Sequence, residues 1–329
     1  MKKNFLYLFC IFCFINCSST KHRTNYPDSI APNKTKKTLY AKLKFNTIDK
    51  LKTTNDVIEF IKSVNPKFAE NKYRKFLIKS TDTIANDLYC GGLFKKWNSQ
   101  NWEKIDINND GKTDLLFISY WYDYMSFVII DEGGNHFKLF RLSNSITEEC
   151  EFAKPIQIRQ KNELLLYHSK SVLDDNSDYK SIPITDTLTY KFDSFIEINV
   201  HEGIHYDINS IEFISGGSSG FSPEFELSIN NQGYANFKGI DFVNFKGKSS
   251  KSISLDKFHE LKQMLEYIKV KDLKNNYDVP WTDDQTVILK IKFADGSIKE
   301  IRDYGLQGTF GLSSIYTKLI KIGTETDWK

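Results

Sequence analysis

The sequence lacks a large surplus of charge of either sign, because 45 Lys and Arg residues stand against 42 Asp and Glu residues. A nucleic-acid-binding protein needs a clustered basic face, so no nucleic-acid partner is predicted. Beyond the first residues the chain also lacks any apolar run near the roughly 20 residues of a membrane-spanning helix. No nucleophile elbow, phosphate loop or dinucleotide fingerprint occurs. Aromatic residues, at 14%, favour a well-filled, β-rich core.

The N-terminus has the pattern of an export signal. A basic start at Lys2 and Lys3 precedes a nearly unbroken apolar run over 5–15. The run ends in Phe14-Ile15-Asn16-Cys17, and these four residues resemble the lipobox of bacterial lipoproteins. That resemblance implies a signal peptide over 1–17, a lipid on Cys17 and anchorage to a membrane of the cell envelope. Ordinary signal cleavage is the alternative.

Residues 18–38 form a predicted tether. They are rich in Lys, Thr, Asn, Pro and Ser and cannot bury enough apolar surface to offset the entropy of ordering. Residues 18–23 contain no acidic side chain, and this composition favours an anchor that faces the periplasm.

Two cysteines, Cys90 and Cys150, remain in the body of the chain once the signal and Cys17 are set aside. In an oxidising compartment such a pair predicts one disulfide. Two buried free thiols are the alternative, because sequence alone does not show that the two Cα atoms lie close enough.

Residues 39–205 predict an α+β domain with an antiparallel sheet. Thr53–Asp56 precede an amphipathic stretch over 57–64, which indicates a capped helix, and 68–77 predict a second short helix. Alternating and β-branched residues then predict strands separated by turns. These strands cover 115–121, 125–130, 136–142, 156–167 and 182–190.

Residues 206–329 predict a second α+β domain, again with a mainly antiparallel sheet and one or two packed helices. Hairpins are expected over 225–240 and over 287–303, the latter with an Asp295-Gly296 turn. A helix begins at Ser254, and a closing helix covers 312–322.

The order of short motifs in this second part is similar to the DUF6438 domain of bacterial lipoproteins. The motifs include Ile211-Glu212-Phe213, Tyr234–Gly239, Asp303-Tyr304-Gly305 and Trp328. The resemblance implies that fold over roughly 208–329, and it implies no activity. Many such domains carry a Cys-Phe-Gly-x-Cys-Pro loop, but this chain has no cysteine in the corresponding segment, 217–223.

An Asp-rich loop over 106–114 is the strongest candidate for a metal site. Asp106, Asn108, Asp110 and Asp114 occupy positions 1, 3, 5 and 9, and the Lys112 carbonyl adds a backbone oxygen. Ca²⁺ prefers six to eight oxygen ligands, so a structural calcium ion is predicted. Phe117 stands at position 12, where an EF-hand needs Glu, so an EF-hand is excluded. The flanks resemble a single FG-GAP or VCBS-type repeat. A metal-free loop of Asx turns is the alternative.

His201-Glu202-Gly203-Ile204-His205 matches the H-E-x-x-H pattern of zinc proteases. That chemistry needs both histidines on one face of a helix. The flanking residues alternate like strands and Gly203 disfavours a helix, so a zinc hydrolase is the alternative function and no catalytic residue is assigned.

Tyr120-Trp121-Tyr122-Asp123-Tyr124 could stack on a sugar, although aromatic residues in hairpins more often pack across strands. The sequence as a whole favours a non-catalytic, envelope-anchored binding or scaffolding protein whose partner is an unidentified protein or glycan. A carbohydrate-binding protein that uses this hairpin is a further alternative.

Overall fold

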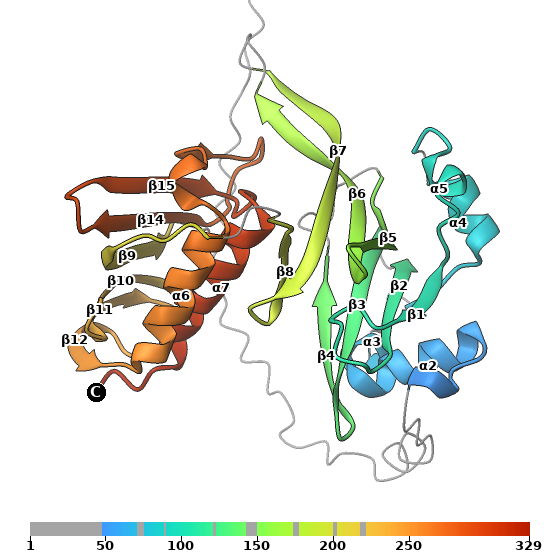
Figure 1. The fold of residues 1–329 in the computed structure, drawn as a ribbon, viewed down its shortest axis with the longest axis horizontal. Helices are drawn as coiled ribbons and strands as arrows, with labels where there is room; N and C mark the ends of the chain where they lie inside the picture. The colour runs from blue at the N-terminus through green and yellow to red at the C-terminus, as the bar shows by residue number, and fades with distance from the viewer. Residues whose placement is uncertain are drawn as a thin grey trace, which may run out of the picture. The chain divides into compact units, whose positions relative to one another are not determined.

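The structure is a computed structural model that describes residues 48–70, 76–88, 90–120, 123–142, 150–173, 178–199, 203–217 and 222–329. All of them lie in one compact unit, residues 44–329. The fold is α+β, with three sheets that are antiparallel apart from one short parallel pair, and this confirms the predicted class (Figure 1). None of the helices in the described ranges combines the length and apolarity that a membrane crossing requires.

Sheet A is a four-stranded meander in which neighbours in the chain are neighbours in space. The predicted hairpin over 115–130 is present as β2 and β3, which pair Phe117 with Phe127 so that the two rings stack 5.3 Å apart. The strands are β1 (Trp102–Ile105), β2 (Asp114–Tyr120), β3 (Tyr124–Gly133) and β4 (His136–Arg141).

Helix α2 (Thr54–Val64) covers one face of sheet A. The predicted N-terminal cap takes the form of a capping box, since the Thr53 hydroxyl accepts from the N–H of Asp56 and the Asp56 carboxylate accepts from the N–H of Thr53. Phe60 and Ile61 are fully buried against the sheet. Because successive side chains of a strand point to opposite faces, Leu115 faces this helix and Leu116 faces away from it.

Sheet B packs on the other face of sheet A. Leu116 and Val128 of sheet A share a core with Leu164 and Leu188 of sheet B, all at most 2% exposed. Sheet B is a second four-stranded meander. Its strands are β5 (Phe152–Ile158), β6 (Lys161–Leu173), β7 (Tyr179–Lys191) and β8 (Ser194–Glu197).

Several short elements differ from the prediction. Of the helix expected over 68–77, the first residues belong to α3 (Lys67–Glu70), 71–75 lie outside the described residues, and Leu77 forms a β-bridge with Tyr120 instead. Two further short helices, α4 (Thr81–Asp87) and α5 (Leu93–Lys96), follow it. The strand expected over 156–167 is a hairpin, because Arg159 and Gln160 both adopt positive φ and reverse the chain.

Sheet C has seven strands in the order β12-β11-β10-β9-β14-β15-β13. Strand β14 shows the alternation of a half-covered sheet, with every second residue from Val287 to Phe293 buried. The strands are β9 (Ile208–Gly216), β10 (Glu224–Asn230), β11 (Tyr234–Asp241), β12 (Gly247–Ser252), β13 (Asn276–Tyr277), β14 (Thr286–Phe293) and β15 (Ile298–Tyr304).

Helices α6 (Leu255–Tyr267) and α7 (Phe310–Glu325) lie side by side over the apolar face of sheet C (Figure 1). A Cβ at Gly323 of α7 would lie 2.5 Å from the buried ring of Phe225, so only glycine allows this close approach. Trp328, which follows α7, stacks on Phe237 with centroids 4.6 Å apart and donates its indole N–H to the Gly323 carbonyl. The chain after the helix thus completes the core of sheet C.

Glu197, at the end of β8, contacts the first turn of α7. Its two carboxylate oxygens accept the N–H groups of Phe310 (2.6 Å) and Gly311 (2.9 Å). Backbone N–H groups at a helix start have no partner inside the helix, and a carboxylate there also favours the helix dipole. This contact fixes the position of α7 on β8.

We expect the stability of the wild-type protein minus that of Glu197→Gln to fall as pH rises, because burial penalises the charge that Glu197 takes on and glutamine carries no charge. Burial raises the pKa of Glu197 in spite of these hydrogen bonds. The pKa of Glu197 is thus higher in the folded protein than in the unfolded chain. The stability that its protonated carboxyl contributes is therefore complete at pH values below the unfolded-state pKa, and it is lost as pH rises through the folded-state pKa. Urea unfolding at about pH 4 and about pH 8 should therefore show the larger difference in acid. An equal or larger difference at the higher pH would contradict this assignment.

Candidate functional site

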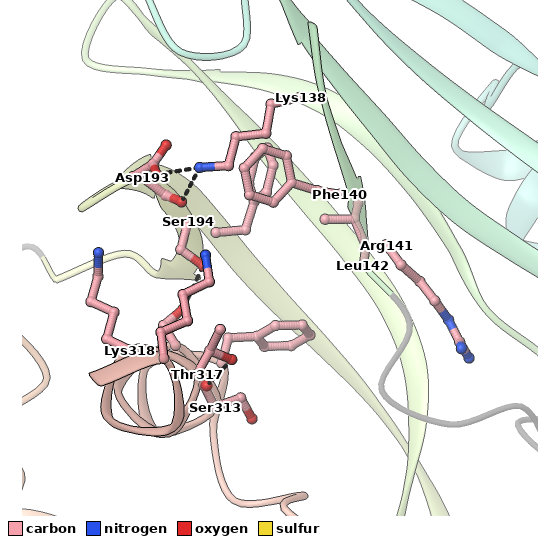
Figure 2. Close-up of a pocket in the computed structure, with 13 residues that line it drawn as sticks. Lys138, Phe140, Arg141, Leu142, Asp193, Ser194, Ser313, Thr317 and Lys318 are labelled. Carbon is pink, nitrogen blue, oxygen red and sulfur yellow. Dashed lines mark hydrogen bonds and ion pairs between the residues drawn. The ribbon is translucent and has the colours of Figure 1, made fainter. Parts of the chain in front are cut away.

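A pocket of about 250 Å³ lies between β4, the turn from β7 to β8, and α7 (Figure 2). The three elements come from distant parts of the sequence and bring amines, hydroxyls and aromatic rings together. The cationic lining residues are Lys138, Arg141, Lys318 and Lys321, the hydroxyls are Ser194, Ser313, Ser314 and Thr317, and Asp193 supplies a carboxylate.

Asp193 organises the β4 side of this pocket. Its carboxylate forms an ion pair with Lys138 and accepts the hydroxyl proton of Tyr190 at 2.7 Å. Burial raises the pKa of Asp193, but the hydrogen bonds from Lys138 and Tyr190 and the charge of Lys318 outweigh it, and the net pKa is lowered. Asp193 is therefore ionised at neutral pH and neutralises Lys138.

Lys318 and Lys321 supply the amines on the α7 side. The Lys318 ammonium donates to Glu260 of α6 at 2.7 Å, and Figure 2 shows Lys318 extending from the helix toward Asp193. Lys321 is exposed and forms no ion pair with any residue whose placement is described. The two lysines are three residues apart and therefore lie on one face of α7.

The hydroxyls of the pocket contact one another or backbone carbonyls. Ser194 and Ser314 share a hydrogen bond of 2.5 Å, Ser313 donates to the Leu306 carbonyl, and Thr317 donates to the Ser313 carbonyl. An activated serine needs a base that accepts its proton. These partners are not bases, so the arrangement suits binding rather than nucleophilic attack.

The Asp-rich loop joins β1 to β2 and is held by its own backbone. Asp106 accepts the N–H groups of Asp110 (2.9 Å) and Gly111 (2.8 Å), and Asp110 accepts the N–H of Lys112 (2.9 Å). The Lys112 ammonium also contacts the Asp110 carboxylate at 2.5 Å. Asn108 accepts a further N–H from Asp110 at 3.1 Å. These are Asx turns, in which carboxylates satisfy the backbone of a tight loop.

Asp114 lies under this loop and is fully buried. One of its oxygens accepts the N–H groups of Ile107 (2.8 Å) and Asn108 (3.3 Å), and the other accepts the N–H of Asp131 (2.8 Å). Burial raises the pKa of Asp114 to about 6 in spite of these three hydrogen bonds. Asp114 thus links the loop to β3, and both of its carboxylate oxygens accept hydrogen bonds from backbone N–H groups.

The loop is also fixed to sheet B through Asn162 at the start of β6. The Asn162 side chain donates to the Asp106 carbonyl at 2.7 Å, and Asn109 and Asn162 exchange two further hydrogen bonds. Among the residues that the structure describes, no three His, Cys, Asp or Glu side chains form a group that could hold a metal. The side-chain oxygens of Asp106, Asn108 and Asp110 accept hydrogen bonds within the loop, and oxygen is the ligand type that Ca²⁺ prefers.

Sheet C, α6 and α7 form the part of the chain that a known family accounts for. Residues 209–323 match the family model of a domain of unknown function, DUF6438. This match confirms the family expected for the C-terminal part from its motif order. A search of the curated proteins and a search of the solved structures return no match. The matched segment contributes the α7 side of the pocket, whereas β4 and β8 precede it.

The cysteines of the first part are joined to each other. Cys90 and Cys150 form a disulfide with Cα atoms 5.6 Å apart, and both residues are at least 93% buried among aromatic side chains. The bond links the segment before α5 to the start of β5. Cys17, the predicted lipid site, lies outside the described residues.

The H-E-x-x-H segment does not form a helix where it is described. His201 and Glu202 lie outside the described residues, but residues 203–207 are irregular and Gly203 has φ of +104°. The His205 side chain is 85% exposed, with its nearest ion-pair partner Glu266 at 3.8 Å. A zinc site on one helical face needs helical backbone at Gly203 and His205, and that backbone is not there.

The aromatic hairpin is packed where it is described. Trp121 and Tyr122 lie outside the described residues. Tyr120 and Tyr124 have ring centroids 5.1 Å apart, and the Lys79 ammonium sits 3.8 Å from the centre of the Tyr120 ring. Tyr124 also donates its hydroxyl proton to Asp87 at 2.5 Å. The rings of these two tyrosines therefore contact each other, and the Lys79 ammonium lies over that of Tyr120.

Sequence reasoning missed the pocket. Lys138, Asp193 and Lys318 are scattered single residues, and no spacing rule connects them. Phe192 and Asp193 both adopt positive φ in the turn between β7 and β8. Asp193 is a common turn residue but Phe192 is not, so the local sequence gives little signal of this turn.

Proposed function

We propose that this chain is a lipid-anchored protein of the cell envelope that acts by binding and not by catalysis. The observation that carries the proposal is the pocket between β4, β8 and α7, in which amines and hydroxyls surround aromatic rings and the hydroxyls have no base as partner. The disulfide between Cys90 and Cys150 supports an oxidising compartment. The lipobox-like Phe14–Cys17 and the tether over 18–38 support the anchor.

The anchor is tested by labelling. Bacteria that express the full chain are grown with radiolabelled palmitate and then fractionated. We expect label in the protein and recovery with the membranes, and we expect both to be lost in Cys17→Ala. An unlabelled wild-type protein that is released from the membrane by salt would show that ordinary signal cleavage occurs instead.

A structural calcium ion in the loop over 106–114 is the second part of the proposal. Asp106, Asn108 and Asp110 would hold it with the Lys112 carbonyl, while Asp114 would orient the backbone beneath. When bound, the ion would supply only charge compensation for the loop carboxylates. The Lys112 ammonium forms an ion pair with Asp110 and supplies part of the same compensation.

Calcium should raise the thermal stability of the purified protein. Saturation at about 100 times the dissociation constant stabilises a folded state by about 2.7 kcal/mol, which for a chain of this size raises Tm by about 4 °C over an EGTA-treated sample. Differential scanning calorimetry measures the shift. Asp110→Ala should abolish it.

The matched control is Asp295→Ala. Asp295 forms the same Asx turn in sheet C, where it accepts the N–H of Ser297 at 2.8 Å, but it lies far along the chain from the loop. This variant loses an Asx turn and should keep the calcium shift. An equal Tm in calcium and EGTA for the wild-type protein would exclude the calcium part of the proposal.

A further inference from the structure

The pocket between β4, β8 and α7 has an apolar floor. Phe140 packs edge to face with Phe195 and with Tyr190, at centroid distances of 5.3 and 5.6 Å. Leu142 is 1% exposed and Phe310 is 8% exposed, and both belong to the core between sheets A and B. An apolar floor excludes water from one side of a ligand and strengthens electrostatic contacts above it.

The charges at the rim do not balance. Three amines, those of Lys138, Lys318 and Lys321, face two carboxylates, those of Asp193 and Glu260. Asp193 neutralises Lys138. The Lys318 ammonium has three N–H donors and contacts one carboxylate, that of Glu260. Figure 2 shows Arg141 pointing away from Asp193 and Lys318. The α7 side of the rim therefore carries one uncompensated positive charge.

We infer that this pocket binds a small molecule with an apolar body and a singly charged carboxylate head, the body resting on Phe140 and Phe310 and the head held by Lys318 and Lys321. The inference rests on the proposed binding function and names the class of its ligand. An ammonium that donates to a carboxylate in a partly desolvated site forms a strong, charge-assisted hydrogen bond. Exposed Thr317, one turn before Lys321, adds a hydroxyl on the same face of α7.

The size of the pocket limits the ligand. Its volume of about 250 Å³ is below the roughly 300–1,000 Å³ of pockets for drug-sized ligands. A medium-chain fatty acid or a simple aromatic acid has the required combination. Inorganic phosphate would not contact the apolar floor, and an alcohol would bring no negative charge to Lys321.

Three probes of matched size or charge separate these contributions: octanoate, octanol and inorganic phosphate. Isothermal titration calorimetry uses the purified full chain in calcium. We expect octanoate to bind, and we expect octanol and phosphate to bind at least about tenfold more weakly, because each lacks one of the two contacts. Octanol that binds as well as octanoate would overturn the role of the amines, and phosphate that binds as well would overturn the role of the floor.

The variants locate the site. Lys321→Glu should weaken octanoate binding by at least about tenfold, and it should fold normally because Lys321 pairs with no described residue. Lys318→Gln/Lys321→Gln should lower the affinity at least as much. Lys292→Gln is the control, since Lys292 pairs with Glu212 on sheet C and does not line the pocket. Equal octanoate affinity in Lys321→Glu and wild type overturns the inference.

Failure here is distinguishable from failure of the proposed function. If palmitate labels Cys17 and calcium raises Tm, but octanoate does not bind, then the ligand class is wrong and the anchored, calcium-stabilised protein remains. If octanoate binds to a protein that palmitate does not label, then the pocket stands without the anchor.

Discussion

Replacing both Cys90 and Cys150 by alanine should lower the free energy of unfolding by about 4 kcal/mol. The disulfide closes a loop of 60 residues, and a cross-link over that length reduces the entropy of the unfolded chain by about this amount. For a chain of this size the loss lowers Tm by about 6 °C. Guanidinium unfolding of the double variant against the wild-type protein measures it.

Reduced wild-type protein serves as the control for packing. Both cysteines are buried beside Phe94 and Phe152, so the alanine substitutions also remove some apolar contact. Reduction alone breaks the cross-link and keeps the side chains. We expect the reduced protein to account for most of the loss, and reduced and oxidised proteins of equal stability would show that the bond is not structural.

Trp328→Ala should lower the free energy of unfolding by about 3–5 kcal/mol, as large-to-small changes of buried aromatic residues do. Trp328 is 2% exposed, its ring lies parallel to that of Phe237 within 4°, and its indole N–H has a buried acceptor in the Gly323 carbonyl. The substitution removes the ring from the core of sheet C and leaves that carbonyl without its partner.

Two neighbouring changes dissect this effect. Trp328→Phe keeps an aromatic ring and loses the N–H donor, so it should cost about 1–3 kcal/mol. Lys329→Ala changes an exposed residue next in the chain and should change stability by less than about 0.5 kcal/mol. Urea unfolding measures all three, and a Trp328→Ala protein as stable as Lys329→Ala would mean that the C-terminal residues do not pack on sheet C.

The elements predicted from the sequence are those whose signals are local. Thr53 and Asp56 form the capping box of α2, and the Asp295-Gly296 turn joins β14 to β15, as expected. Strand β12 was not predicted, because Gly247–Ser252 has no apolar alternation and forms an edge that only β11 pairs. The Arg159–Gln160 hairpin was missed because neither residue is a typical turn former.

The candidate sites also differ in whether their residues are close together in the sequence. The Asp-rich loop over 106–114 is contiguous, so its position and its turns could be expected from spacing alone. The sequence did not show that Asp114 would be buried with its oxygens accepting backbone N–H groups, because that depends on Asp131 in the next strand. The pocket was beyond prediction, since its charges become neighbours only through tertiary packing.

The separation of the pocket residues along the chain has a consequence for the order of folding. Ser194 and Ser314, which share a hydrogen bond across the pocket, are 120 residues apart, and Glu197 and Phe310 are 113 apart. Contacts between distant residues close large loops and form after local ones. A chain that emerges N-terminus first completes sheets A and B before it has the helix that forms the far wall. Ligand binding therefore reports that the last helix has packed, and truncated or partly folded chains in the envelope would be unable to bind.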